Sequence, residues 1–148
     1  MNAFVAAGAG FLLAVLWFDL MFDVQVRGHD GEVPETVLAS IAGYYARVTT
    51  ASRPMNRLVA AVMLATLAAI VAQIARGEDP RWIGWVSLAL AAFPIGLARV
   101  RTVPDAVRLG RRSDSAEAQS AHARSILRDH VACFASILTL LVLQLASA

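Results

Sequence analysis

The sequence contains no lysine, a single cysteine (Cys133) and few charged residues of any kind. All 13 basic residues are arginine, which points either to recognition of anions or to a GC-rich genome, and the second explanation needs no binding site. One cysteine excludes an intrachain disulfide, and no cysteine–histidine spacing of a zinc site is present. Only 16% of the residues are charged, against roughly 25% in a typical soluble domain. These absences exclude a soluble domain of ordinary composition, a disulfide scaffold and a zinc module.

Long hydrophobic runs take the place of the missing charges. Hydrophobic residues make up 58% of the 148 residues, and the mean hydropathy is +0.61. A helix needs about 20 apolar residues to cross a bilayer. Four segments meet this requirement: residues 3–24, 55–75, 82–98 and 126–146. We therefore predict an all-α integral membrane protein, a four-transmembrane-helix bundle that forms a single domain over residues 1–148.

Arginine is distributed unevenly between the connections of the predicted bundle. Eleven arginines lie in or beside the two long connections, and two, Arg76 and Arg81, flank the short one. Because cytoplasmic connections carry an excess of basic residues, we expect the long connections in the cytoplasm and both termini outside it. The expected location is the inner membrane of a bacterial cell, with the lipid bilayer as a partner. The net charge of +2 gives no indication of nucleic-acid binding.

Both long connections contain helical patterns. In the first, apolar residues with the spacing of an amphipathic helix are Val37, Ile41, Tyr44, Tyr45 and Val48. We predict an amphipathic interfacial helix over residues 35–51, lying along the membrane surface. In the second connection, Asp114 followed by Glu117 is typical of a capping box. The fourth long helix is therefore expected to begin there and to project several turns into the cytoplasm before it enters the membrane.

Charged residues reach membrane depth in the first and the last predicted spans. Asp19 and Asp23 are four residues apart, so they share one face of the first helix. The last helix brings a second group to a similar depth: Arg124, Arg128, Asp129 and His130. Because a charge inside a bilayer is costly, such residues are the first candidates for a functional role.

Three interpretations of this cluster remain open. In the structural one, Asp19 or Asp23 pairs with Arg124 or Arg128 and holds the first helix against the last. In the second, Asp19, Asp23 and His130 form a metal or proton site, because carboxylate with imidazole suits zinc, iron or manganese and histidine titrates near neutral pH. In the third, an anionic ligand such as a lipid headgroup binds to arginines and neighbouring residues. The candidate residues for that ligand are Tyr45, Arg47, Arg124 and Arg128.

No motif in the sequence names a reaction or a cofactor, and two classes of function remain. The first is a non-catalytic accessory or assembly subunit, either a homo-oligomer or part of a larger membrane complex. We prefer it because the chain has little extramembrane mass and no convincing catalytic constellation. The second is a small membrane enzyme or transporter that acts on a lipophilic or anionic substrate at the cytoplasm-facing charge cluster of the first and last helices. The two classes differ in whether Asp19, Asp23 and His130 converge on a cavity or are simply paired.

The predicted plan has four short spans, with an arginine- and histidine-bearing stretch at the start of the last. This plan is similar to that of several small bacterial membrane families, including the anthrone-oxygenase-like proteins. The similarity includes no motif specific to one of them, so it implies no site residue and no activity for this chain.

Overall fold

The computed structural model describes residues 1–51, 53–77 and 80–147, and this part of the chain is helical without any strand. The elements are α1 (Asn2–Asp23), η1 (Val24–Val26), α2 (Glu35–Ala46), η2 (Arg47–Ala51), α3 (Arg53–Arg76), α4 (Arg81–Leu97), η3 (Ala98–Thr102), α5 (Val103–Arg111) and α6 (Ala116–Ala146). The predicted all-α class is confirmed. Ser52, within the expected approach to the second span, lies outside the described residues.

Four helical stretches are long and apolar enough to cross a membrane, as the sequence predicted. They are Asn2–Val26, Met55–Arg76, Arg81–Arg111 and Ala116–Ala146. The third stretch is longer than expected because α4 continues through the π-helical turn η3 directly into α5.

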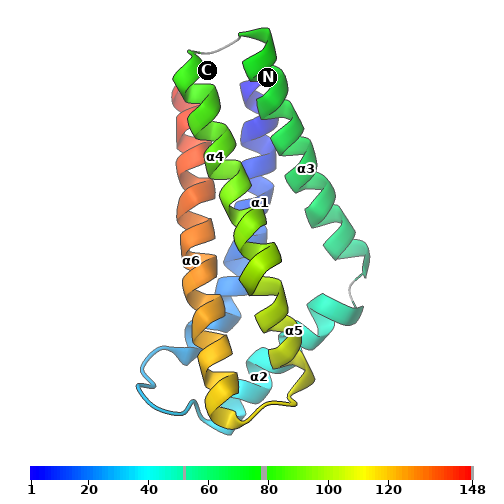
Figure 1. Cartoon of the computed structure of the whole chain (residues 1–148), viewed down its shortest axis with the longest axis vertical. Helices are drawn as coiled ribbons and strands as arrows, with labels where there is room; N and C mark the ends of the chain where they lie inside the picture. Colours follow the sequence, from blue (N-terminus) through cyan, green and yellow to red (C-terminus); the bar gives the residue numbers. More distant parts are fainter. Residues whose placement is uncertain (52, 78–79, 148) are drawn as a thin grey trace.

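The four long helices lie side by side, and α1 and α4 each pack against both α3 and α6 (Figure 1). The N- and C-termini lie at one end of this bundle, and α2 and α5 lie at the other (Figure 1). An even number of long helices requires this arrangement of the termini. The end that carries α2 and α5 is called the inner end below.

Helix α2 does not offer a free apolar face to a membrane surface. Leu38, Ile41 and Tyr45 are buried in a cluster with residues of α5 and α6. The approach to α5 is close, because a Cβ atom added to Gly110 would lie 2.9 Å from the backbone nitrogen of Ala46. The amphipathic pattern of residues 35–51 thus correctly predicted a helix, but protein covers its apolar face. Helix α5, which covers part of this face, was not foreseen.

Helix α6 begins one residue later than the sequence indicated. Its N-cap is Ser115, whose side chain accepts a hydrogen bond from the backbone N–H of Ala118 at 3.3 Å. The first turns of α6 do not project away from the rest of the protein. Ser120 and Ile126 are buried there, and Ile126 packs in the cluster formed with α2 and α5. The Ser120 hydroxyl also accepts the backbone N–H of Val33 at 2.9 Å, which ties the loop before α2 to α6.

Helix α4 contains a proline whose missing hydrogen bond is replaced from α6. Pro94 has no N–H to donate to the carbonyl of Leu90 four residues earlier. The Ser136 hydroxyl donates to that carbonyl at 2.9 Å. An unpaired carbonyl between packed helices would be costly, so this hydrogen bond fixes α4 against α6 at the proline.

Candidate functional site

Two carboxylates of α1 receive hydrogen bonds from two neighbouring tyrosines of α2. The Tyr44 hydroxyl donates to Asp19 Oδ1 at 2.6 Å, and the Tyr45 hydroxyl donates to Asp23 Oδ1, also at 2.6 Å. The Phe22 ring stacks on Tyr44, with centroids 4.1 Å apart and planes 9° apart. Two adjacent residues of α2 thus bind two residues of α1 that are four positions apart. Helix α2 can do so because it crosses the inner end of the bundle (Figure 1).

The remaining oxygen of Asp23 contacts the imidazole of His130 on α6. Asp23 Oδ2 lies 2.6 Å from His130 Nδ1, and Asp23 is 1% exposed. Both carboxylate oxygens of Asp23 thus have a partner. The arrangement is a carboxylate–imidazole dyad, with the Tyr45 hydroxyl as a third member on the carboxylate. An acidic partner of this kind fixes the orientation and the tautomer of the ring.

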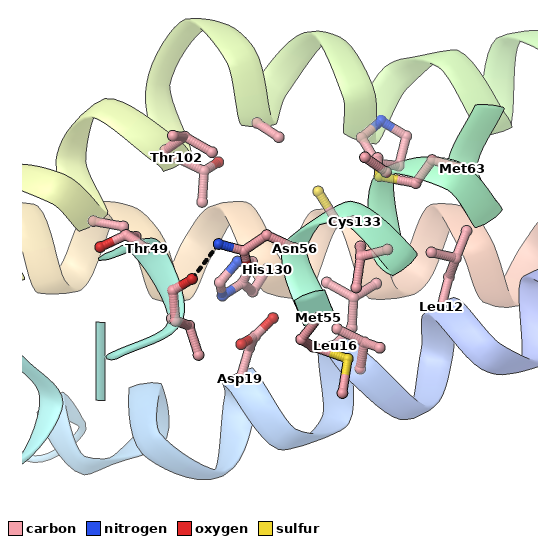
Figure 2. Close-up of a pocket in the computed structure, with 18 of the residues that line it drawn as sticks. Leu12, Leu16, Asp19, Thr49, Met55, Asn56, Met63, Thr102, His130 and Cys133 are labelled. Carbon is pink, nitrogen blue, oxygen red and sulfur yellow. Dashed lines mark hydrogen bonds between the residues drawn. The ribbon is translucent and has the colours of Figure 1, made fainter. Parts of the chain in front are cut away.

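The second ring nitrogen of His130 is available for chemistry. Nε2 has no hydrogen-bond partner among residues 1–51, 53–77 and 80–147, and His130 lines a cavity in the bundle. Figure 2 shows the imidazole beside Asp19, with Cys133 further along the same wall. The dyad therefore presents one nitrogen to the cavity while the buried Asp23 holds the other.

The environment of the tyrosines keeps their hydroxyls protonated. Burial, and then the negative charge of Asp19, raise the pKa of Tyr44 well above its ordinary value. Burial, and then the charge of Asp23, raise the pKa of Tyr45 in the same direction. Both side chains therefore act as hydrogen-bond donors at neutral pH.

The cavity has a volume of about 470 Å³ and is lined mainly by apolar side chains. Its wall includes residues of α1, α2, η2, α3, α4, η3, α5 and α6. Leu12, Leu16 and Met63 are among the apolar residues, and Asp19, Asn56 and Thr102 are among the polar ones that lie near His130 (Figure 2). The polar residues of the wall are Asp19, Tyr44, Tyr45, Thr49, Asn56, Thr66, Thr102, His130 and Cys133. A mainly apolar hollow with a few polar groups at one end is the usual form of a small-molecule site.

Thr66 marks the other end of the cavity, where α1 and α3 approach closely. A Cβ atom added to Gly8 would collide with the Thr66 side chain, so α1 and α3 meet here as tightly as a glycine permits. The α1 residues of the wall run from Leu12 to Asp19, seven positions apart, so the cavity runs along about 10 Å of α1. The Thr66 hydroxyl is buried and has no hydrogen-bond partner in the described part of the chain.

Asp129, the neighbour of His130, belongs to a separate ion pair. It is fully buried and accepts hydrogen bonds from the Arg101 guanidinium and, at 3.0 Å, from the Thr102 hydroxyl. His122, about two helical turns closer to the start of α6, contacts Asp105 at 3.0 Å instead. His130, Asp129 and His122 of α6 therefore belong to three separate contacts, with Asp23, Arg101 and Asp105 respectively.

The expected partners Arg124 and Arg128 do not contact Asp19 or Asp23. Arg124 donates to the backbone carbonyls of His29, at 2.8 Å, and of Gly31. Arg128 is exposed. The sequence placed these arginines near the right depth, but the rotation of α6 about its axis turns His130, not an arginine, toward α1.

The other candidate residues are also separated by the structure. Arg47 is exposed in η2, whereas Tyr45 is 3% exposed and bonded to Asp23, so the two do not form a common headgroup site. Within the described residues, no three histidine, cysteine, aspartate or glutamate side chains are grouped to hold a metal ion. In the sequence, Tyr44 is one of the apolar residues that predicted the amphipathic helix over residues 35–51. Its hydrogen bond to Asp19 had no signal in the sequence beyond its place next to Tyr45.

The chain matches no known protein family, no curated protein and no solved structure.

Proposed function

We propose that this chain is a small multi-pass membrane enzyme that binds a lipophilic substrate in the cavity and uses His130 as its general acid and base. The four apolar helices would cross the inner membrane of a bacterium, with both termini outside the cytoplasm and the inner end facing it. The observation that carries the proposal is the His130 imidazole in the cavity wall, whose Nδ1 is held by Asp23 at 2.6 Å while Nε2 has no partner in the described part of the chain.

The dyad supports proton transfer at the polar end of a bound molecule. An imidazole held at Nδ1 can accept and return a proton at Nε2, and the Asp23 carboxylate stabilises the imidazolium that results. The Tyr45 hydroxyl binds the other carboxylate oxygen and keeps Asp23 in place. Asp19 lies in the same part of the wall, where the Tyr44 hydroxyl donates to its Oδ1, and its carboxylate offers an acceptor to the polar end of the substrate.

The shape of the cavity supports a lipophilic substrate. Most of its wall is aliphatic, and its polar groups are concentrated at the inner end. A molecule bound there would place its apolar part between α1, α3, α4 and α6 and its polar end beside His130. An ion pair that only joined α1 to α6 would need neither a cavity nor a free ring nitrogen.

The proposal is tested with a pair of histidine variants on one helix. Purified protein in nanodiscs is incubated with a lipid extract of the source cells, and products are detected by mass spectrometry. His130→Gln should lower turnover about a hundredfold or more, which is the usual contribution of a general acid or base. His122→Gln is the matched control, because His122 is also an α6 histidine in contact with an aspartate, Asp105 of α5, but it does not line the cavity.

Two results would contradict the proposal. Equal turnover by the wild type and His130→Gln would remove the catalytic role of the dyad. Alternatively, the protein could retain no lipophile, turn nothing over and co-purify with another membrane protein or with further copies of itself. That result would favour the accessory subunit or homo-oligomer that the sequence first suggested.

A further inference from the structure

A second hollow lies on η3 and α5, and arginines line it. Arg99, Arg108 and Arg111 border an open groove whose other lining residues are Val103, Pro104 and Val107. No acidic residue lines the groove. None of these three arginines has an ion pair or a side-chain hydrogen bond with residues 1–51, 53–77 or 80–147.

The other charged residues near the groove pair with residues that do not line it. Arg101 binds Asp129, and Arg112 binds Glu35 at 2.6 Å. Asp105, the only acidic residue of α5, contacts His122 at 3.0 Å. The groove is therefore a concentration of positive charge with no counter-ion among the described residues, formed on one side of an uninterrupted helical stretch.

The arginine groove and the apolar cavity share a wall. Val103 and Val107, one helical turn apart on α5, line both hollows. Val103 is half exposed, so the boundary between the two hollows lies at the surface of the protein and not in its interior. A single molecule that passes the two valines can have an apolar part in the cavity and a charged part in the groove.

The groove also lies at the depth of lipid phosphates in the proposed membrane arrangement. Residues 82–98 contain no charge, and Arg99 is the first charged residue after them. The apolar stretch therefore ends at the groove, and headgroups begin where the hydrocarbon core ends. Basic pockets at this level bind the headgroups of anionic lipids.

We propose that the molecule held by the cavity is an anionic lipid whose phosphate binds to Arg99, Arg108 and Arg111. One hydrocarbon chain lies in the cavity, passing Val103 and Val107. The assignment of the apolar part rests on the function proposed above, whereas the phosphate site rests on the groove itself. Guanidinium groups suit this ligand because their planar donor pairs match phosphate oxygens.

The test compares two triple variants that remove the same amount of charge. Native mass spectrometry measures retention of phosphatidylglycerol and of phosphatidylcholine with the same chains, and wild-type protein should retain the anionic lipid preferentially. Arg99→Gln/Arg108→Gln/Arg111→Gln should weaken this binding about a hundredfold, from about fivefold for each arginine. Arg27→Gln/Arg57→Gln/Arg128→Gln, at exposed arginines outside both hollows, should bind like the wild type.

A third variant separates the headgroup from the chain. Ala60→Leu/Ala98→Leu narrows the cavity without changing the groove and should also reduce retention of phosphatidylglycerol. Loss of binding in both this variant and the groove variant supports the proposal. If only the narrowed cavity loses its lipophile, the phosphate site is wrong while the proposed function stands.

Inorganic phosphate distinguishes a lipid from a free anion. If free phosphate displaces phosphatidylglycerol at equal concentration and the narrowed cavity binds normally, the groove is a site for small anions and the proposal is overturned. If the triple groove variant does not fold, Arg108→Gln alone provides the test, with an expected loss of about fivefold.

Discussion

The two tyrosines of the chain are neighbours on α2, and each donates its hydroxyl to a different carboxylate of α1. These hydrogen bonds explain how two acidic residues, about one turn apart on α1, can lie between apolar helices. Each carboxylate has a neutral donor, and Asp23 has an imidazole in addition. At the scale of single residues, the site is therefore a set of short hydrogen bonds that join α1 to α2 and α6.

The tyrosines give a direct optical test of this geometry. Because burial and the nearby carboxylates raise the pKa of Tyr44 and Tyr45, tyrosinate absorbance should be absent at pH 10, the ordinary value. The tyrosines favour the folded state below pH 10, and that contribution is lost as the pH rises toward their raised pKa values. The measurement is an ultraviolet pH titration, to which only these two residues contribute tyrosinate.

Asp19→Asn is the informative variant in that titration. Removing the charge should move the onset of Tyr44 ionisation to lower pH, yet leave it above the ordinary value because burial remains. Wild-type protein that forms tyrosinate at pH 10 while still folded would contradict the buried pairing of Tyr44 and Tyr45.

At the scale of elements, the crossing of α4 and α6 depends on a hydrogen bond that no helix pattern reveals. The Leu90 carbonyl is free because Pro94 has no N–H, and Ser136 supplies the missing donor. Ser136→Ala should therefore lower the free energy of unfolding by about 1 kcal/mol. In a Pro94→Ala background, the restored N–H of residue 94 binds Leu90, and Ser136→Ala should then have almost no effect.

This double-mutant cycle is measured by denaturation in a detergent micelle. The two substitutions should be strongly non-additive, because both act on the same carbonyl. Additive effects would show that Ser136 and Pro94 act independently. Thr139→Ala is the control, since the Thr139 hydroxyl binds only the Ala135 carbonyl within α6 and should give the same change in both backgrounds.

At the scale of the whole molecule, a chain of polar side chains joins the four long helices near the termini. Gln73 of α3 donates to Asn2 of α1 at 2.7 Å and to Gln144 of α6 at 3.1 Å. Gln144 donates in turn to Ser87 of α4 at 3.0 Å. Hydrogen bonds of this kind join helices in a bilayer. These polar side chains thus join the four long helices at the end that carries the termini, and α2 and α5 cover the inner end. The cavity lies between the two ends.

The proposed orientation of the molecule has a separate test. In a Cys133→Ser background, a single cysteine at Ser113 should react with an impermeant maleimide only from the cytoplasmic side. A cysteine at Pro80, in front of α4, should react only from the outside. Both residues are exposed, so the difference reports the side of the membrane. The reverse labelling pattern would contradict the expectation from the arginine distribution.

The sequence by itself determined the four long apolar helices, the helix over residues 35–46 and the common end of the two termini. These features depend on local composition and length, because a helix satisfies its own backbone hydrogen bonds. The sequence also brought Asp19, Asp23 and His130 to a similar depth, since depth follows from counting residues along a helix.

Only the tertiary structure decided which of these groups meet. Depth does not determine the rotation of a helix about its axis, so counting residues could not choose between His130 and Arg128 as the partner of Asp23. The position of α2 was equally non-local. Its burial against α5 and α6 turned Tyr44 and Tyr45 toward α1 and gave the cavity part of its wall. The site therefore arises from contacts between segments far apart in the chain, and no local pattern encodes such contacts.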